Sequence, residues 1–180
     1  MGKGVRNLMK KYEFRVLISI IALILSLGAL LAAFYYYKEL GIKRPLAHQI
    51  ETIELVRSVN IEEKGQKYEI EVSLNKVSDI QEPYQKIIEK VEASLEPGDY
   101  QLVIKDQRNT SLQNKFKDMQ PAVYEALANK RFIWLDEEIA RQLQKTNMKH
   151  KIFIDEEHLY LQINDGSSYL YEIINREPKE

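Results

Sequence analysis

The longest apolar run of the chain extends from Val16 to Tyr37, 22 residues without a charged side chain. At about 1.5 Å per residue, a helix of this length spans roughly 33 Å, enough to cross a hydrocarbon core of about 30 Å. A core helix of a soluble domain usually keeps a polar stripe, whereas this run has only Ser19 and Ser26, which can bond back to their own helix. The apolar region of a cleaved signal is shorter, about 7–15 residues. The run therefore favours an uncleaved signal-anchor, a transmembrane helix over residues 16–37.

The end of this run carries aromatic side chains. Leu31-Ala32-Ala33 could serve as a cleavage site, but cleavage there would leave Phe34 and three tyrosines at the new N-terminus. As an aromatic belt at a membrane–water boundary, these rings are in a typical place. Five lysines and arginines precede the run within residues 1–15, and three follow it within residues 38–52. This bias predicts a single-pass protein of the cell membrane, with a basic cytoplasmic segment over residues 1–15 and an extracytoplasmic C-terminal domain.

The remainder of the chain has the length of one ordinary domain. Gly41 and Pro45 are expected to break the helix within a juxtamembrane linker over residues 38–46. The domain is expected over residues 47–176, followed by a flexible tail over residues 177–180.

Alternating apolar and polar positions begin the domain. Residues 53–61 and 68–74 alternate on either side of a charged turn, which predicts a β-hairpin. The first segment also fits a helix, because Ile50, Ile53 and Arg57 would share one helical face.

A helix and a strand are expected next. Pro83 in a first turn and Pro97-Gly98 as a stop bound a helix with one apolar face, formed by Tyr84, Ile87, Ile88, Val91 and Leu95. The short apolar run of residues 100–106 is typical of a central strand.

Two further helical patterns follow. Thr110 and Gln113 fit a capping box. The stripe behind them continues across Pro121, which predicts one kinked helix or two helices that share a face; it consists of Leu112, Phe116, Met119, Val123 and Leu127. Asp136 is expected to cap another helix, which ends at Asn147.

The last part of the domain reads as three strands, over residues 151–155, 158–163 and 168–174, joined by connections short enough for hairpins. The predicted order is β-β-α-β-α-α-β-β-β. Helices grouped against an antiparallel or mixed sheet make this an α+β fold.

Charge is distributed unevenly between the two parts. Residues 1–44 carry eight basic and two acidic side chains, whereas residues 45–180 carry 18 basic and 25 acidic. An acidic domain repels phosphates, so nucleic acid is not expected as a partner. The sequence contains no cysteine, which excludes disulfides, cysteine metal clusters and thiol nucleophiles.

Motifs that carry chemistry are not found in the sequence. There is no phosphate-binding G-x-x-x-x-G-K, no G-x-S-x-G elbow and no H-E-x-x-H pair. His48, His150 and His158 are isolated in sequence, and surface histidines are the simpler interpretation, although folding could bring the last two together. We therefore expect no catalytic residue, metal site or cofactor.

Two acidic clusters have a structural and a functional interpretation. Asp136-Glu137-Glu138 and Asp155-Glu156-Glu157 could hold a divalent ion or act in acid–base chemistry. A helix N-terminus and a turn, respectively, explain them without a ligand, and we prefer this interpretation.

Two residues are weak candidates for ligand binding or docking. Arg108 follows the strand of residues 100–106 and could bind a carboxylate, although a local bond to Asp106 is the simpler prediction. Trp134 could be an exposed docking side chain, but a core position is more typical. The tyrosines at positions 160, 169 and 171 could form an adhesive face or be ordinary strand residues.

Small residues recur on one face of the apolar run. Ser19, Ala22, Ser26, Ala29 and Ala33 follow spacings of three and four residues, which match a left-handed helix–helix crossing. This face could associate with a second span, although alanine and serine are common in membrane helices.

These patterns predict a membrane-anchored, non-catalytic envelope protein. Its external α+β domain would bind protein partners, or a further copy of the chain, in an assembly, scaffold or accessory role. A sensor for a small ligand or peptide is the alternative and would need a pocket near Arg108. An envelope hydrolase would need two carboxylates that converge in a cleft.

Overall fold

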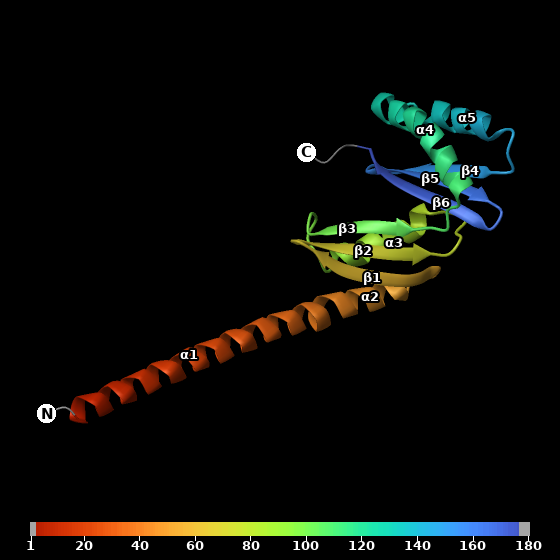
Figure 1. Ribbon diagram of the computed structural model, residues 1–180. Helices are drawn as coiled ribbons and strands as arrows, with labels where there is room; N and C mark the ends of the chain where they lie inside the picture. Colours follow the sequence, from red (N-terminus) through yellow and green to blue (C-terminus); the bar gives the residue numbers. More distant parts are fainter. Residues whose placement is uncertain (1–2, 177–180) are drawn as a thin grey trace. The chain divides into compact units, whose positions relative to one another are not determined.

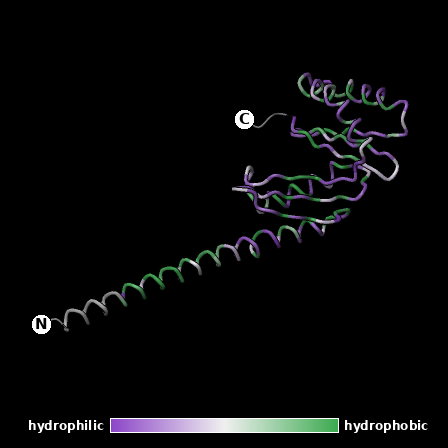
Figure 2. The backbone as a smooth tube through the Cα atoms, viewed as in Figure 1, coloured by the Kyte–Doolittle hydropathy of each residue, from purple (hydrophilic) through white to green (hydrophobic). Residues whose placement is uncertain are grey.

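The computed structural model describes the backbone of residues 3–176 and the side chains of residues 14–176. The chain divides into two units, Met1–Pro45 and Leu46–Glu180. The first unit is helical: α1 covers Lys3–Lys38, and its apolar stretch forms an almost unbroken hydrophobic segment (Figure 2). The helix is long and apolar enough to cross a membrane. The side chains of most of the basic segment, and the expected tail of residues 177–180, lie outside the described residues.

The expected break of the helix within a juxtamembrane linker is wrong, because residues 38–46 are helical. A π-helical turn at Glu39–Lys43 follows α1, and α2 then covers Arg44–Glu51. The turn is closed by the Arg44 N–H, which donates to the Glu39 carbonyl five residues earlier. Pro45 lies in the first turn of α2, where a missing N–H is tolerated. The cost of Gly41 in a helix, about 1 kcal/mol, is too small to end it.

The first sheet of the second unit has the order β1-β2-β3. β1 (Val56–Lys64) pairs antiparallel with β2 (Lys67–Leu74), and β2 pairs parallel with β3 (Tyr100–Lys105). α3 (Gln81–Glu92) forms the crossover between the two parallel strands (Figure 1). The segment that fitted both a helix and a strand is divided, with helix up to Glu51 and strand from Val56.

Period-two alternation in β2 buries one face of this sheet. Tyr68, Ile70, Val72 and Leu74 are buried, while the residues between them are partly exposed. The apolar face of α3 is buried as expected, through Tyr84, Ile87 and Val91 among others. The hairpin prediction is confirmed, with a two-residue turn in which Gly65 has a φ of +68°.

Two helices follow β3. α4 (Thr110–Asn129) is a single helix that contains Pro121, and α5 covers Phe132–Leu143. The predicted capping box is wrong: Asn109 is the N-cap, and its Oδ1 accepts from the Leu112 N–H at 2.8 Å. The predicted cap at Asp136 is also wrong, because α5 already begins at Phe132 and places Asp136 within the helix.

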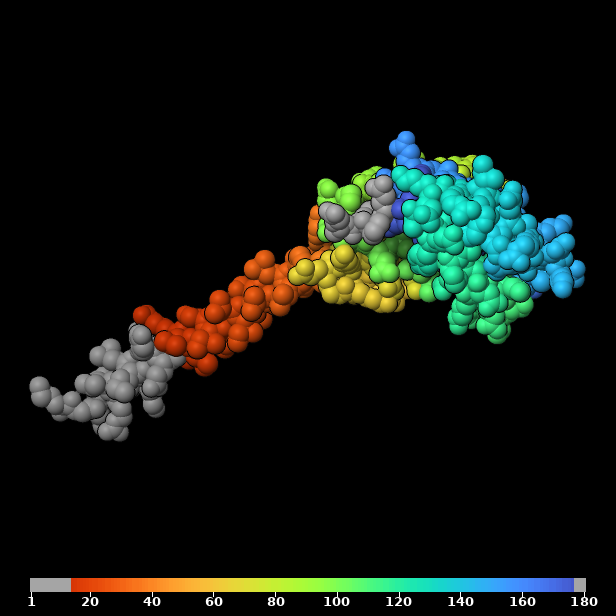
Figure 3. All heavy atoms as spheres, turned by 90° about the horizontal axis from the view of Figure 1, so that it is seen from above, coloured from red at the N-terminus to blue at the C-terminus, as the bar shows by residue number. Residues whose placement is uncertain are grey.

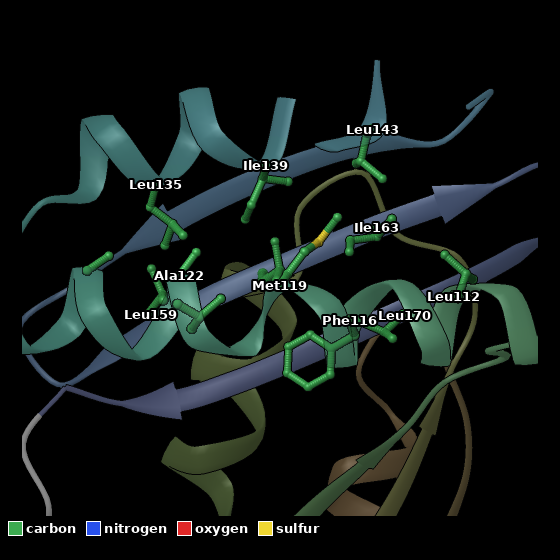
Figure 4. Packing of buried hydrophobic residues seen from close by; sticks show 13 residues of the cluster. Leu112, Phe116, Met119, Ala122, Leu135, Ile139, Leu143, Leu159, Ile163 and Leu170 are labelled. Carbon is green, nitrogen blue, oxygen red and sulfur yellow. The ribbon is translucent and has the colours of Figure 1, made fainter. Parts of the chain in front are cut away.

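The second sheet is an antiparallel meander of β4 (Lys149–Ile154), β5 (His158–Asp165) and β6 (Ser168–Asn175), as the sequence predicts. α4 and α5 cover one face of it (Figure 1). The stripe of α4 and the inward face of α5 meet alternate residues of β5 and β6 there (Figure 4); the cluster comprises Leu112, Phe116, Met119, Ala122, Val123, Ala126, Leu135, Ile139, Leu143, Leu159, Leu161, Ile163 and Leu170.

The opposite face of the second sheet joins the first sheet. Tyr160, Tyr169 and Tyr171 are buried on this face, so they are not an exposed adhesive surface. The side chains of Tyr169, Tyr171 and Gln162 lie against the connection between β2 and α3, and the Tyr160 ring packs edge-on against Tyr84 of α3 at 5.5 Å. The Tyr169 hydroxyl donates to the Leu74 carbonyl at 2.7 Å, and the Gln162 amide donates to the Val77 carbonyl at 2.8 Å. The tyrosines thus hold the two sheets together as one domain.

The predicted α+β class and the order of the strands and longer helices are confirmed. Two predictions about the sheet are corrected. The strands form two three-stranded sheets, and β3 lies at the edge of its sheet instead of its centre. A short apolar run is compatible with either place, because only pairing with distant strands decides it.

Candidate functional site

β3 and β6 are neighbouring edge strands of the two sheets (Figure 1). Just beyond β3, Gln107 and Tyr169 form an isolated antiparallel bridge, in which the Tyr169 N–H donates to the Gln107 carbonyl at 3.2 Å. Among the described residues, this is the only bridge between the two sheets. Beyond this bridge, the facing edges of β3 and β6 are not paired with each other, which leaves an opening between the two strands.

A cleft of about 770 Å³ occupies this opening. Its two long walls are residues 100–104 of β3 and 171–175 of β6. Tyr84 and Ile88 of α3 and Tyr124 of α4 also line it. Tyr124 is 59% exposed, although it lies on the helix that covers the second sheet. Figure 3 shows the side chains of α4 and α5 (teal to cyan) gathered on one side of the domain.

The walls combine polar and apolar groups, and aliphatic side chains of β3 and β6 supply much of the apolar part. Leu102, Val103, Ile104, Ile173 and Ile174 are each half-buried, so part of each side chain remains accessible. Half-buried isoleucine and leucine side chains on two facing strands form a surface that can contact apolar groups of a partner.

Arg108 lines the cleft next to the Gln107–Tyr169 bridge. Its guanidinium binds Asp106 at 2.6 Å and Glu172 at 2.6 Å, and it donates to the Tyr171 carbonyl at 3.2 Å. Asp106 also accepts from the Tyr171 N–H at 2.8 Å. Burial opposes the charge, but the hydrogen bonds to Asp106 and Glu172 outweigh it and raise the pKa of Arg108. The predicted local bond to Asp106 is present, and two carboxylates already occupy the guanidinium.

The other end of the cleft is acidic and is called the acidic end below. A second hollow of about 440 Å³ continues it across shared lining residues that include Tyr84, Glu92 and Glu157. Glu89 and Asp155-Glu156-Glu157 line this hollow, and among lysines and arginines only Lys67 and Arg108 line either space. Burial, followed by the charges of Asp155, Glu157 and Glu92, raises the pKa of Tyr84 to about 12. Negative potential is therefore concentrated at this end.

Alternate backbone groups of β3 face the cleft. In parallel pairing, every second residue directs its N–H and C=O to the same neighbour. The Tyr68 N–H of β2 donates to the Asp99 carbonyl at 2.7 Å, and the register then directs Gln101 and Val103 to β2. The backbone groups of Tyr100, Leu102 and Ile104 point away from β2 and make no hydrogen bond with another part of the described chain.

The facing edge of β6 has the same property. Its register with β5 directs Tyr169, Tyr171, Ile173 and Asn175 away from β5. Tyr169 and Tyr171 are bonded through Gln107, Asp106 and Arg108 as described above. Within residues 3–176, the edge groups of Ile173 and Asn175 have no partner. The cleft is thus bounded by two rows of free peptide groups.

Of the other candidate residues, Glu157, His158 and Tyr171 also line the cleft, whereas Trp134, His150 and Asp136-Glu137-Glu138 do not. Trp134 is half-buried and packs against the hydrophobic cluster between the second sheet and the helices α4 and α5. It also stacks with Arg131, whose guanidinium carbon lies 4.7 Å from the ring centre. His150 bonds to Asp136 at 2.9 Å, whereas His158 packs edge-on against Tyr84 at 5.3 Å. Across the described residues, no three histidine or carboxylate side chains are grouped as metal ligands would be.

Asp155-Glu156-Glu157 forms the turn between β4 and β5, in agreement with the structural interpretation of this acidic cluster. Asp155 Oδ1 accepts from the backbone N–H groups of Glu157 and His158 at 2.9 and 2.6 Å. The other acidic cluster lies inside α5, where Glu138 pairs with Arg141 at 2.6 Å. A helix N-terminus therefore does not explain it.

The small-residue face of α1 lies outside this domain and is tested by no contact here. Ser19 Oγ donates to the Arg15 carbonyl at 3.0 Å and Ser26 Oγ to the Leu23 carbonyl at 2.9 Å, so both hydroxyls bond within their own helix. Association through Ser19, Ala22, Ser26, Ala29 and Ala33 remains a prediction.

Sequence reasoning missed most of the cleft. Of its lining residues, only Arg108 was a candidate for ligand binding or docking, and Glu157, His158 and Tyr171 were considered but given structural interpretations. The strands themselves were recognised, but their free edges depend on which strands pair, and the sequence carries no local signal for that. Comparison of the chain with protein-family models, with curated proteins and with solved structures finds no match.

Proposed function

We propose that the chain is a single-pass, membrane-anchored and non-catalytic protein whose extracytoplasmic α+β domain binds protein partners in an assembly, scaffold or accessory role. The observation that carries this proposal is the cleft between the unpaired edges of β3 and β6. Free peptide groups beside half-buried aliphatic side chains suit a protein partner, because both can be satisfied by another polypeptide.

The charged groups in the cleft support binding over catalysis. Arg108 is held by Asp106 and Glu172, and the Glu92 carboxylate accepts from the Tyr100 hydroxyl at 3.0 Å. A general acid or base must reach a reacting group. Arg108, Asp106, Glu172 and Glu92 are already held by hydrogen bonds, which leaves Glu157 as the one lining carboxylate without a side-chain partner among the described residues.

The membrane part of the proposal rests on α1 and on the charge bias around it. The helix has the length and composition of a span. The excess of lysine and arginine before the apolar run favours a cytoplasmic N-terminus.

A topology measurement tests the orientation. A reporter that is active only outside the cytoplasm, fused after Glu180, should be active, and a cytoplasmic reporter at the same position should be silent. The reverse pattern would overturn the orientation and would place the cleft in the cytoplasm.

Photo-crosslinking in the native membrane tests partner binding. A photo-reactive residue in place of Val103, which lines the cleft, should yield a crosslinked protein adduct. The control carries the same residue in place of Asn60, which is exposed on the strand β1. Absence of any adduct specific to position 103 would contradict a protein-binding role for the cleft.

A sensor for a small ligand or peptide is the second candidate, because the cleft lies next to Arg108. Two observations weaken the small-ligand form: Arg108 is already paired with two carboxylates, and the cleft is open along its length. Small carboxylic acids should therefore leave the melting temperature of the full chain unchanged. A dose-dependent rise that Arg108→Met abolishes would favour the sensor instead.

A further inference from the structure

The two inner edges of the sheets differ from the two outer edges. β1, an outer edge, ends in Glu62-Glu63-Lys64, and the other outer edge, β4, begins with Lys149-His150-Lys151. Charged side chains on an edge strand discourage pairing with another strand. The free stretches of the inner edges, in contrast, carry aliphatic side chains at Leu102, Ile104 and Ile173. The free stretches of the inner edges, residues 100–104 and 173–175, contain no charged side chain.

The spacing and direction of the inner edges define what can pair with them. The five lining residues of each strand extend over about 13–17 Å at 3.3 Å per residue. β3 and β6 are antiparallel at their bridge, so a strand placed between them would be parallel to one and antiparallel to the other. Both pairings are normal in mixed sheets. One added strand would join the two three-stranded sheets into a sheet of seven.

Charge adds a second requirement. Glu89, Glu156 and Glu157 at the acidic end are exposed and make no ion pair with any described residue. Glu92 lies beside them, and Lys67 is the one lysine that lines the cleft. A basic side chain on the partner would complement this end.

We propose that the cleft binds an extended polypeptide segment that adds a strand between β3 and β6, with apolar side chains along the walls and a lysine or arginine at the acidic end. This inference rests on the proposed protein-binding function and specifies the partner's conformation and charge. The segment donates to and accepts from the free groups of Leu102 and Ile104 on one side and of Ile173 and Asn175 on the other.

The first test uses the full chain in detergent micelles and a displayed library of random dodecapeptides as the probe. Enriched peptides should alternate apolar residues and carry lysine or arginine near one end. The tightest peptide, made synthetically, should slow hydrogen exchange at the amides of Leu102, Ile104 and Ile173 by at least about tenfold, because they gain a partner. The Val103 amide, which faces β2, should be protected with or without peptide. Binding that leaves the three edge amides unprotected would overturn strand addition.

A proline variant tests the backbone directly. Leu102→Pro removes one N–H from the free edge and no bond from the ladder with β2, so the domain should keep its fold. Peptide binding should weaken by about tenfold, the equivalent of one or two backbone hydrogen bonds. Leu102→Val retains the N–H and should bind within about twofold of the wild type. Equal binding by the proline and valine variants would contradict the proposal.

A double variant tests the charge requirement. Glu92→Gln combined with Glu157→Gln should weaken binding of the selected peptide by about two- to fivefold at low salt, since exposed ion pairs are individually weak. Glu62→Gln on the outer strand β1 is the matched control and should have no effect. Selected peptides without basic residues, or binding insensitive to the double substitution, would overturn the charge requirement.

The outcomes separate this inference from the proposed function. A protein adduct at position 103 that persists in Leu102→Pro would leave partner binding intact and overturn strand addition alone. Absence of that adduct in the wild type would contradict the protein-binding function itself.

Discussion

Asp155 holds the connection between β4 and β5 through four hydrogen bonds to one carboxylate. Besides the two backbone N–H groups, it accepts from the Tyr160 hydroxyl at 2.6 Å and from the Gln85 amide at 3.2 Å. The Gln85 bond ties the turn to α3 of the first sheet. Burial would raise the pKa of Asp155, but the bonds from Tyr160, His158, Glu157 and Gln85 outweigh it and lower the pKa below its ordinary value.

This lowered pKa predicts a pH-dependent contribution to stability. Asp155→Asn should reduce the free energy of unfolding by about 1–2 kcal/mol at pH 7, because an amide replaces an ionised acceptor. The ionised carboxylate contributes its full stabilisation above its ordinary pKa, 3.8. This contribution is lost as the pH falls through the lower pKa that Asp155 has in the folded state. Urea unfolding of both proteins between pH 7 and pH 3 would measure this convergence. Glu156→Gln, at an exposed neighbouring position, should show no such convergence, and a constant difference for Asp155→Asn would contradict the assignment.

At the scale of single elements, α4 shows how local signals compete. Its predicted capping box used Thr110, but the helix begins one residue earlier, with Asn109 as the cap. The Asn109 amide also donates to Asp165 at 3.3 Å, which links the helix start to the β5–β6 hairpin. Pro121 is exposed within the helix, and the apolar stripe holds both halves against the second sheet. Packing therefore overrides a residue that would end an isolated helix.

The cap assignment predicts different costs at two adjacent positions. Asn109→Ala should lower the free energy of unfolding by about 1 kcal/mol, because the Leu112 N–H loses its acceptor. Thr110→Ala should change it by only a few tenths of a kcal/mol. Chemical denaturation of the two variants provides the comparison. A larger loss for Thr110→Ala would favour the capping box that the sequence suggested.

On the scale of the whole molecule, the two sheets depend on one another through polar contacts, one buried and one exposed. The connection between β2 and α3 crosses the face of the second sheet opposite α4 and α5. There the Val77 N–H donates to the Tyr171 hydroxyl at 2.8 Å, and Lys151 donates to the Ser78 carbonyl at 2.8 Å. Burial is the main cause that raises the pKa of Tyr171 to about 12, so its hydroxyl remains neutral at physiological pH.

We predict that residues 46–180 fold without α1 and unfold in one cooperative transition. Tyr171→Phe should lower the free energy of unfolding by about 1–3 kcal/mol, because the Val77 N–H is left buried without an acceptor, and the transition should remain single. Thermal unfolding followed by circular dichroism and by tyrosine fluorescence measures both properties. Two separate transitions would show that the sheets are independent, and a non-cooperative trace would show that the domain needs the membrane or a partner to fold.

Local pattern alone determined the apolar helix, the order of the nine main strands and helices of the domain, and the α+β class. Each depends on periodicity over a few residues, which the sequence carries directly. The boundaries were less secure, as Pro45, Asp136 and Thr110 show, because neighbouring residues offer similar turn and capping chemistry.

Only the tertiary structure decided that the strands form two sheets, that β3 is an edge strand and that the tyrosines of β5 and β6 are buried. It also decided that Arg108 is paired with Glu172, 64 residues away along the chain. All these features depend on which distant segments pair. Strand pairing is specified by summed packing and backbone hydrogen bonds across the sheet, and no single stretch of sequence encodes it. The cleft between β3 and β6 is a feature of this kind, because it is formed by two strand edges that are far apart in the sequence.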